Sequence, residues 1–147
     1  MINNTTEKRV ELTNFDNIKS LFGAYDQHLI SIQKEFDVDI IVREGELRII
    51  GENNSVTMAT KVIKLLIDKL DENHAISNHT IDYTIRLVRD GEGKRTKELN
   101  DIIYTTTRGK IIRCKTLGQK KYIDSIYNND IVFSIGPAGT GKTYLAM

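Results

Sequence analysis

Residues 130–143, DIVFSIGPAGTGKT, decide what kind of fold the chain contains. The first six, 130–135, are mostly apolar and β-branched, which predicts a buried β-strand. The next eight, 136–143, match the phosphate-binding pattern G-x-x-x-x-G-K-[ST] in full. The YLAM that follows at 144–147 can continue as a helix. The sequence therefore predicts a phosphate-binding loop (P-loop) between a strand and a helix.

The residue types within this loop suit phosphate binding. Successive backbone N–H groups at the start of a helix form a concavity that favours anions. Glycines permit positive φ and let the backbone approach phosphate oxygens, the lysine reaches the β- and γ-phosphates, and the threonine hydroxyl can ligate Mg²⁺. A glycine-rich turn that binds nothing is the alternative. The predicted binding residues are Gly136, Pro137, Ala138, Gly139, Thr140, Gly141, Lys142 and Thr143, with Thr143 as the metal ligand.

A second informative stretch, 115–122, precedes the predicted strand and opens a helix that we expect to run to about 127. In helicase-like ATPases a glutamine at this place can pair with adenine, because its amide carries one donor and one acceptor. Gln119 occupies that place. Thr116-x-x-Gln119 also matches a capping box, in which the glutamine returns to the backbone N–H of the cap residue. The two roles can hold in different ligand states.

The N-terminal part predicts an α+β domain of order β-α-α-β-β-α. Hydrophobic spacing places its elements at 9–12, 15–22, 25–36, 38–43, 46–50 and 56–70. This order is similar to that of KH-like modules, in which a GXXG loop holds the backbone of a single strand. The corresponding residues here are Gly23-Ala24-Tyr25-Asp26, so an aspartate replaces the second glycine and would repel phosphates. Gly23 as a simple helix C-cap is the alternative.

The remaining segments are less distinctive. We expect a frayed tail at 1–8, an Asn14 helix cap, a turn at 51–54 and a polar linker at 71–80. Residues 80–89 fit both a helix and a strand, and we favour the helix. Residues 102–105 and 110–113 predict a small hairpin. We expect His28 on a helix face and His74 and His79 on the surface, since no ligand partner has metal-binding spacing.

The composition restricts the classes of protein to which the chain can belong. Its 147 residues are 39% hydrophobic and 28% charged, as in soluble globular proteins. The single cysteine, Cys114, excludes an internal disulfide and a cysteine-based zinc site. No apolar run approaches the roughly 18 residues that span a bilayer, and the polar N-terminus predicts a cytoplasmic protein. Residues 86–121 carry 11 Lys/Arg against 4 Asp/Glu, which suits either a polyanion-binding region or a solvated linker.

Taken together, three stretches resemble the PhoH family of P-loop ATPases: KTLGQKKY at 115–122, NDIVF at 129–133 and GPAGTGKTYLA at 136–146. Leu21-Phe22-Gly23 and Arg43-Glu44-Gly45 also resemble the family's N-terminal region. The resemblance implies a KH-like domain at 9–71, a linker with a helix and a small hairpin at 72–114, and the start of a RecA/helicase-like α/β ATPase domain at 115–147.

The same resemblance implies an ATP- and Mg²⁺-binding cytoplasmic protein that acts in RNA metabolism or the phosphate-starvation response. Gln119 would contact adenine, and 136–143 would hold the phosphates. Single-stranded RNA, a partner nuclease and further copies of the protein are implied as partners. The family's acidic Walker B strand is not found in these 147 residues, so we expect a truncated chain that does not hydrolyse ATP alone. An RNA-binding module or a nucleotide-regulated scaffold without hydrolysis is the alternative.

Overall fold

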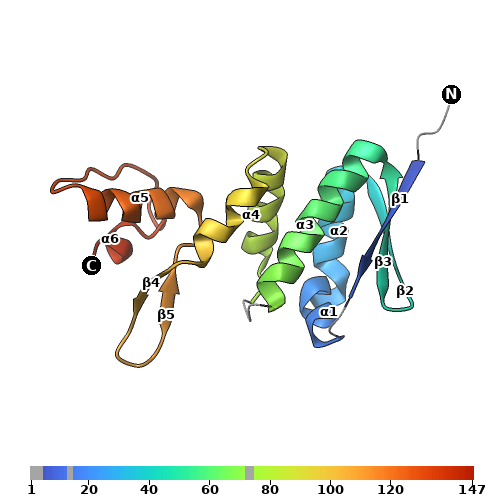
Figure 1. The fold of residues 1–147 in the computed structure, drawn as a ribbon, viewed down its shortest axis with the longest axis horizontal. Coiled ribbons are helices and arrows are strands. Elements are labelled where there is room, and N and C mark those ends of the chain that lie inside the picture. Colours follow the sequence, from blue (N-terminus) through green and yellow to red (C-terminus); the bar gives the residue numbers. More distant parts are fainter. Residues whose placement is uncertain (1–4, 13–14, 72–74) are drawn as a thin grey trace. The chain divides into compact units, whose positions relative to one another are not determined.

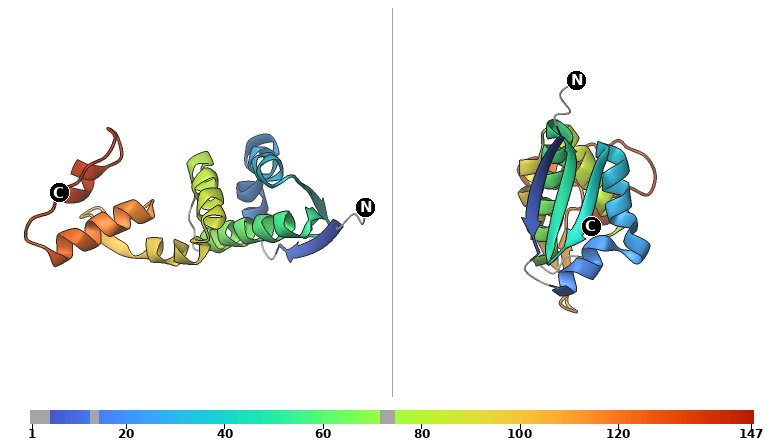
Figure 2. Two further views of the ribbon diagram at one scale, coloured as in Figure 1. Left: turned by 90° about the horizontal axis from the view of Figure 1, so that it is seen from above. Right: turned by 90° about the vertical axis from the view of Figure 1, so that its right-hand side faces the viewer.

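The computed structural model of the chain describes residues 5–12, 15–71 and 75–147. The described residues form two compact units that divide between Gly93 and Lys94. Figure 1 traces both units, and Figure 2 gives two further views.

The N-terminal unit has the expected element order. It runs β1 (Thr5–Glu11), α1 (Phe15–Phe22), a single 3₁₀ turn η1 (Ala24–Asp26), α2 (Gln27–Phe36), β2 (Val38–Arg43), β3 (Glu46–Glu52) and α3 (Asn53–Asp71). The three strands form an antiparallel sheet in the order β1-β3-β2. In Figure 1 the helices of this unit lie on one face of the sheet. The β-α-α-β-β-α order predicted from hydrophobic spacing is thus confirmed.

Periodicity explains the core of this unit. Leu47 and Ile49 are fully buried on the inward face of β3, at the period of two that a half-buried strand requires. The inward face of α3 repeats at three and four residues, as a helix that packs on a sheet requires. Its buried apolar residues are Val56, Ala59, Val62, Ile63, Leu66 and Leu70.

Several boundaries differ from those predicted. Residues 5–8 belong to β1 rather than to a frayed tail, because they pair with the end of β3 from Ile49 to Glu52. The turn expected at 51–54 is absent, since Gly51 and Glu52 continue β3 and α3 begins at Asn53. The predicted Asn14 cap and His74 lie outside the described residues.

Residues 80–89 form a helix, as favoured, but they are not part of a linker. Helix α4 (Asn78–Arg89) begins at the N-cap Ser77, whose hydroxyl accepts from the Thr80 N–H at 3.2 Å. Its buried residues Ile81, Ile85 and Val88 join the core of the N-terminal unit. The unit therefore extends to Gly93 instead of ending near 71.

The C-terminal unit is smaller. It contains most of the 3₁₀ segment η2 (Gly93–Asn100), the hairpin β4 (Ile102–Thr105) and β5 (Ile111–Arg113), helix α5 (Leu117–Asn128) and the short helix α6 (Lys142–Ala146). The hairpin and α5 agree with the sequence prediction. Leu117 and Ile123 of α5 and Cys114 before it are buried.

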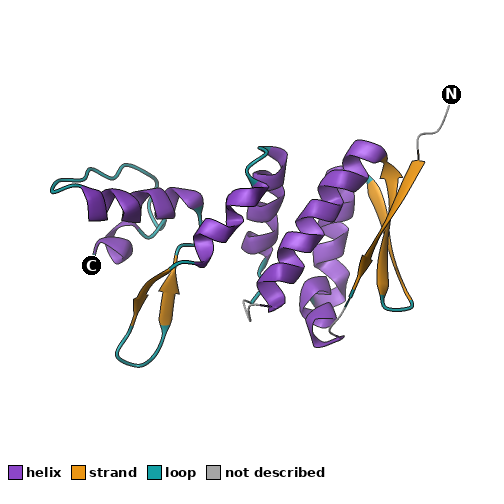
Figure 3. Ribbon diagram, in the orientation of Figure 1, coloured by secondary structure: helices purple, strands orange, loops and turns teal. Residues whose placement is uncertain are grey.

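The buried strand predicted at 130–135 is wrong for this structure. The segment has no strand hydrogen bonding, and Figure 3 draws it as a loop between α5 and α6. Ile131, Phe133 and Ile135 are 77%, 90% and 99% exposed. A strand requires a neighbour for its backbone groups, and nothing among the described residues pairs with this segment.

Candidate functional site

The predicted phosphate-binding residues are continuous in the structure: residues 136–141 form a loop, and Lys142 and Thr143 begin α6. Gly139 and Gly141 have φ of 75° and 85°, which non-glycine residues adopt only with strain. Gly136, which was expected to need the same freedom, does not have a positive φ. Thr143 is exposed in the first turn of α6, where its hydroxyl can face a metal ion held by phosphates. Two of the three loop glycines therefore have the conformation for which glycine is required.

The Lys142 ammonium folds back over its own loop. Its Nζ donates to the carbonyl oxygens of Gly136 at 2.8 Å and Pro137 at 2.5 Å. It also donates to the Thr140 hydroxyl at 3.3 Å, and this hydroxyl donates to the Pro137 carbonyl at 3.0 Å. Loop oxygens thus hold the cation that the sequence predicts to bind phosphate.

Gln119, the predicted adenine contact, lies against the loop. Its side-chain Nε2 donates to the Thr140 carbonyl oxygen at 3.1 Å, and its Oε1 accepts from the Lys115 N–H at 2.7 Å. The Thr116 hydroxyl accepts from the Gln119 N–H at 3.2 Å, which confirms the first half of the capping box. The second half is wrong, because the glutamine side chain caps Lys115 rather than Thr116.

The contact between Gln119 and Thr140 joins residues 21 apart in the sequence. No local pattern signals it, because motif spacing identifies each residue without indicating which carbonyl the glutamine reaches. The structure thus brings together the expected base contact and the expected phosphate loop.

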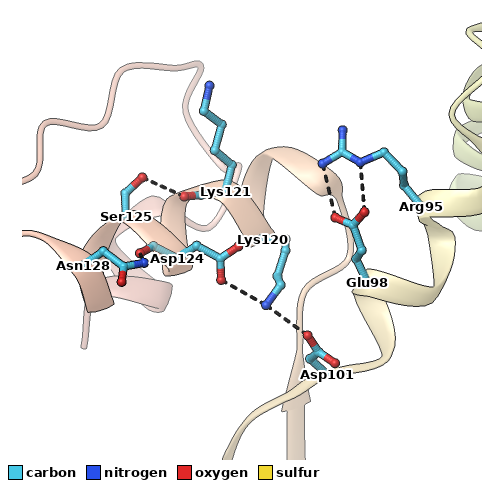
Figure 4. Close-up of polar contacts among 8 residues, drawn as sticks. All are labelled: Arg95, Glu98, Asp101, Lys120, Lys121, Asp124, Ser125 and Asn128. Atoms are coloured by element: carbon cyan, nitrogen blue, oxygen red, sulfur yellow. Dashed lines mark hydrogen bonds and ion pairs between the residues drawn. The ribbon is translucent and has the colours of Figure 1, made fainter.

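Helix α5, which carries Gln119, is fixed by an ion-pair cluster (Figure 4). Lys120 Nζ lies 3.0 Å from Asp101, just before β4, and 3.0 Å from Asp124, one turn further along α5. These two hydrogen-bonded carboxylates raise the pKa of Lys120 above its ordinary value. Arg95 and Glu98 pair beside it through two hydrogen bonds. Lys120, the residue after Gln119, therefore connects α5 to Asp101 at the base of the hairpin.

Burial raises the pKa of the neighbouring Cys114 thiol, which the charge of Lys120 only partly offsets. Cys114 is 5% exposed. A buried neutral thiol next to α5 acts as a small apolar residue, not as a nucleophile.

In the N-terminal unit, residues 23–26, which were compared with a GXXG loop, pack against a buried side chain. Gly23 has φ of 71° and lies against the ring of His28, which is on α2 as expected and is buried. Tyr25 and Asp26 both have left-handed backbone torsions, and Tyr25 is 97% exposed. A pocket of about 850 Å³ opens beside the loop, lined in part by Lys19, His28 and His79.

Comparisons with known proteins agree with these motifs. A family model described as PhoH-like protein matches residues 111–147. A PhoH-like protein of Bacillus subtilis (strain 168) is 35% identical over 138 residues, which cover 93% of this chain and 43% of that protein. The chain is therefore similar to PhoH-like proteins over most of its length. PhoH-like proteins of Mycobacterium tuberculosis (strain ATCC 25618 / H37Rv) and Synechocystis sp. (strain ATCC 27184 / PCC 6803 / Kazusa) are 36% and 31% identical, over 90% and 86% of the chain.

The chain spans less than half the length of the curated relatives that it matches. No solved structure matches it. Among its described helices, none is both long and apolar enough to cross a membrane.

Proposed function

We propose that this chain binds ATP with Mg²⁺ through residues 136–143 and Gln119. The contact of the Gln119 amide with the Thr140 carbonyl carries the proposal, because it places a base-pairing side chain against the loop expected to hold the phosphates. The residues fit the ligand: Gly139 and Gly141 have the torsions that a phosphate cradle uses, and Lys142 already binds oxygen atoms there. Thr143 would supply a hydroxyl to Mg²⁺.

The proposed role of Lys142 in ATP binding can be tested directly. Titration calorimetry should show that Lys142→Ala lowers the affinity of the chain for Mg-ATP at least about tenfold, since a charge-assisted hydrogen bond to phosphate is lost. Lys121→Ala is the matched control, because Lys121 is an exposed lysine on α5, outside the loop. Equal ATP affinity in the wild type and Lys142→Ala would contradict the proposal.

For the complete protein we propose ATP hydrolysis linked to RNA metabolism or to the phosphate-starvation response, in the cytoplasm. Single-stranded RNA, a partner nuclease and further copies of the protein are the partners that this function would involve. Phosphoryl transfer requires a second acidic metal ligand and a positioned water in addition to the loop. The 147-residue chain alone should therefore bind ATP without turning it over. ATP turnover by the complete protein, measured with and without single-stranded RNA, tests this step; no turnover in either condition would contradict it.

A second function, RNA binding by a KH-like module without hydrolysis, is favoured by the exposed Tyr25, which follows the pocket-lining residues Gly23 and Ala24 in the same loop. An exposed aromatic ring can stack on an unpaired base. Tyr25→Ala should then weaken binding of single-stranded RNA, whereas Tyr127→Ala, which removes another exposed tyrosine, should not. The element order and the sheet order support a KH-like fold, whereas Asp26 argues against a phosphate contact at its position.

A further inference from the structure

Both hydrogen-bonding groups of the Gln119 amide are already used within the chain. The Nε2 group donates to the Thr140 carbonyl, and Oε1 accepts from the Lys115 N–H. The amide nitrogen has two N–H groups and the amide oxygen two lone pairs, so each of these contacts uses one of two positions. A base that pairs with the amide therefore meets a side chain that Thr140 and Lys115 already hold.

Thr140 also contacts the phosphate-binding lysine. Its backbone carbonyl accepts from Gln119, and its hydroxyl accepts from Lys142. Lys142 is held as well by the carbonyl oxygens of Gly136 and Pro137, and it must leave these oxygens to bind phosphate. One residue thus connects the side chain expected to contact the base with the side chain expected to contact the phosphates.

We propose that Gln119 couples adenine recognition to the opening of the phosphate-binding loop. In the free chain its amide holds the Thr140 carbonyl and stabilises the closed loop, in which Lys142 binds loop oxygens. Adenine withdraws the amide from Thr140, and the loop then rearranges around the phosphates more readily. This inference rests on the proposed ATP binding and adds a regulatory role for Gln119.

The chemistry of the base edges makes this coupling selective. Adenine presents a donor at N6 beside an acceptor at N7, and a glutamine amide pairs with both. On the same edge guanine presents only acceptors, at O6 and N7, so a guanine placed with this edge toward Gln119 cannot donate to the glutamine oxygen. A guanine nucleotide bound in this orientation therefore leaves the Thr140 contact in place, and the loop stays closed.

The coupling predicts opposite effects on two ligands. A ligand that gains affinity in one state shifts the population toward that state, and the coupling acts in both directions. Gln119→Ala removes the contact that stabilises the closed loop, so Mg-inorganic triphosphate, which has no base, should bind about two- to tenfold more tightly than to the wild type. Mg-ATP should lose its preference over Mg-GTP and approach the affinity of inorganic triphosphate.

The experiment measures the affinities of Mg-ATP, Mg-GTP and Mg-inorganic triphosphate for the wild-type chain, Gln119→Ala and Ser125→Ala. The last variant is a control on the same helix, since the Ser125 hydroxyl donates to the Lys121 carbonyl within α5. A rise in triphosphate affinity confined to Gln119→Ala supports the coupling. An unchanged affinity means that Gln119 acts on the base alone, and a loss for all three ligands means that it only maintains the fold; either result overturns the proposal.

A second measurement needs no variant. Adenosine, which carries no phosphate, should shift the backbone amide NMR signals of Thr140, Gly141 and Lys142 in the wild-type chain, and guanosine should not. Adenosine that leaves these signals unchanged while it binds would also overturn the coupling.

The experiments can contradict the proposed ATP binding and the proposed coupling independently of each other. A wild-type chain that binds Mg-ATP no better than Lys142→Ala contradicts ATP binding itself. Tight ATP binding without the triphosphate effect contradicts only the coupling.

Discussion

Gly23 lies directly against the imidazole of His28: a Cβ built on the glycine would be 2.7 Å from Cε1 and 2.8 Å from both ring nitrogens. His28 cannot turn outward freely, because its side chain is only 5% exposed and its Nδ1 lies 3.2 Å from the Leu21 carbonyl oxygen. The glycine between α1 and α2 is therefore required for packing, whatever the loop binds.

Gly23→Ala should destabilise the N-terminal unit by about 2–4 kcal/mol, from left-handed strain plus overpacking. Gly45→Ala is the matched control. Gly45 also has a positive φ, of 81°, but a Cβ there meets nothing within 4 Å, so only strain of about 1–2 kcal/mol remains. Urea unfolding measures both, and equal losses would show that the His28 contact contributes nothing. An RNA-binding test at this loop should accordingly change Tyr25 instead of Gly23.

Helix α4 should contribute to the stability of the N-terminal unit. Ile81 is 1% exposed in its core, so Ile81→Ala should cost about 2–5 kcal/mol through lost burial and the cavity left behind. Ile30→Ala, at a 43% exposed position of α2, should cost far less. Thermal unfolding followed by circular dichroism compares the two, and similar melting temperatures would mean that α4 is dispensable.

Gly141→Ala should weaken Mg-ATP binding by at least about tenfold, because the added methyl group strains a loop residue with φ of 85° that must approach phosphate. Gly118→Ala is the contrasting change within α5, where alanine has room and improves helix propensity by about 1 kcal/mol. Calorimetry should show ATP affinity reduced only by Gly141→Ala. A similar reduction in both variants would indicate a general effect on the unit.

Lys120 should stabilise the C-terminal unit in a pH-dependent way. Because Asp124 and Asp101 raise its pKa, the folded state favours the charged form, and this contribution is fully present below the unfolded lysine pKa of about 10.4. Lys120→Met should therefore cost about 1 kcal/mol from pH 7 to 9, and the difference should shrink as pH rises further. Lys121→Met provides the control at an exposed position. A difference that already disappears between pH 7 and 9 would contradict the ion-pair assignment.

Local patterns predicted most of the N-terminal unit. The spacing of apolar residues from Val56 to Leu70 identified α3, and the β-branched runs around Glu44-Gly45 identified the β2–β3 hairpin. The polar stretch before Ser77 suggested a linker, because composition alone does not show that Ile81, Ile85 and Val88 pack on the same core. Which elements share a core depends on contacts distant in the sequence.

In the candidate site too, local patterns were predictable from the sequence, whereas contacts between distant residues were not. The spacing of glycines, lysine and threonine predicted the loop, and the position of Gln119 predicted an adenine contact. The capping-box pattern did not predict that the amide would reach Thr140, because that contact depends on how the chain returns after α5. The apolar run at 130–135 predicted a strand from residue types, but strand formation depends on a partner.

The exposed segment 131–135 affects how the chain behaves in concentrated solution. Its three large apolar side chains and unpaired backbone can add to the open edge of another sheet, and β-branched segments without charge or proline are especially prone to do so. Self-association should therefore increase with protein concentration while the core of each unit remains folded. Residues 131–135, which lie outside both cores, should then limit the protein concentration that can be used for crystallisation or NMR.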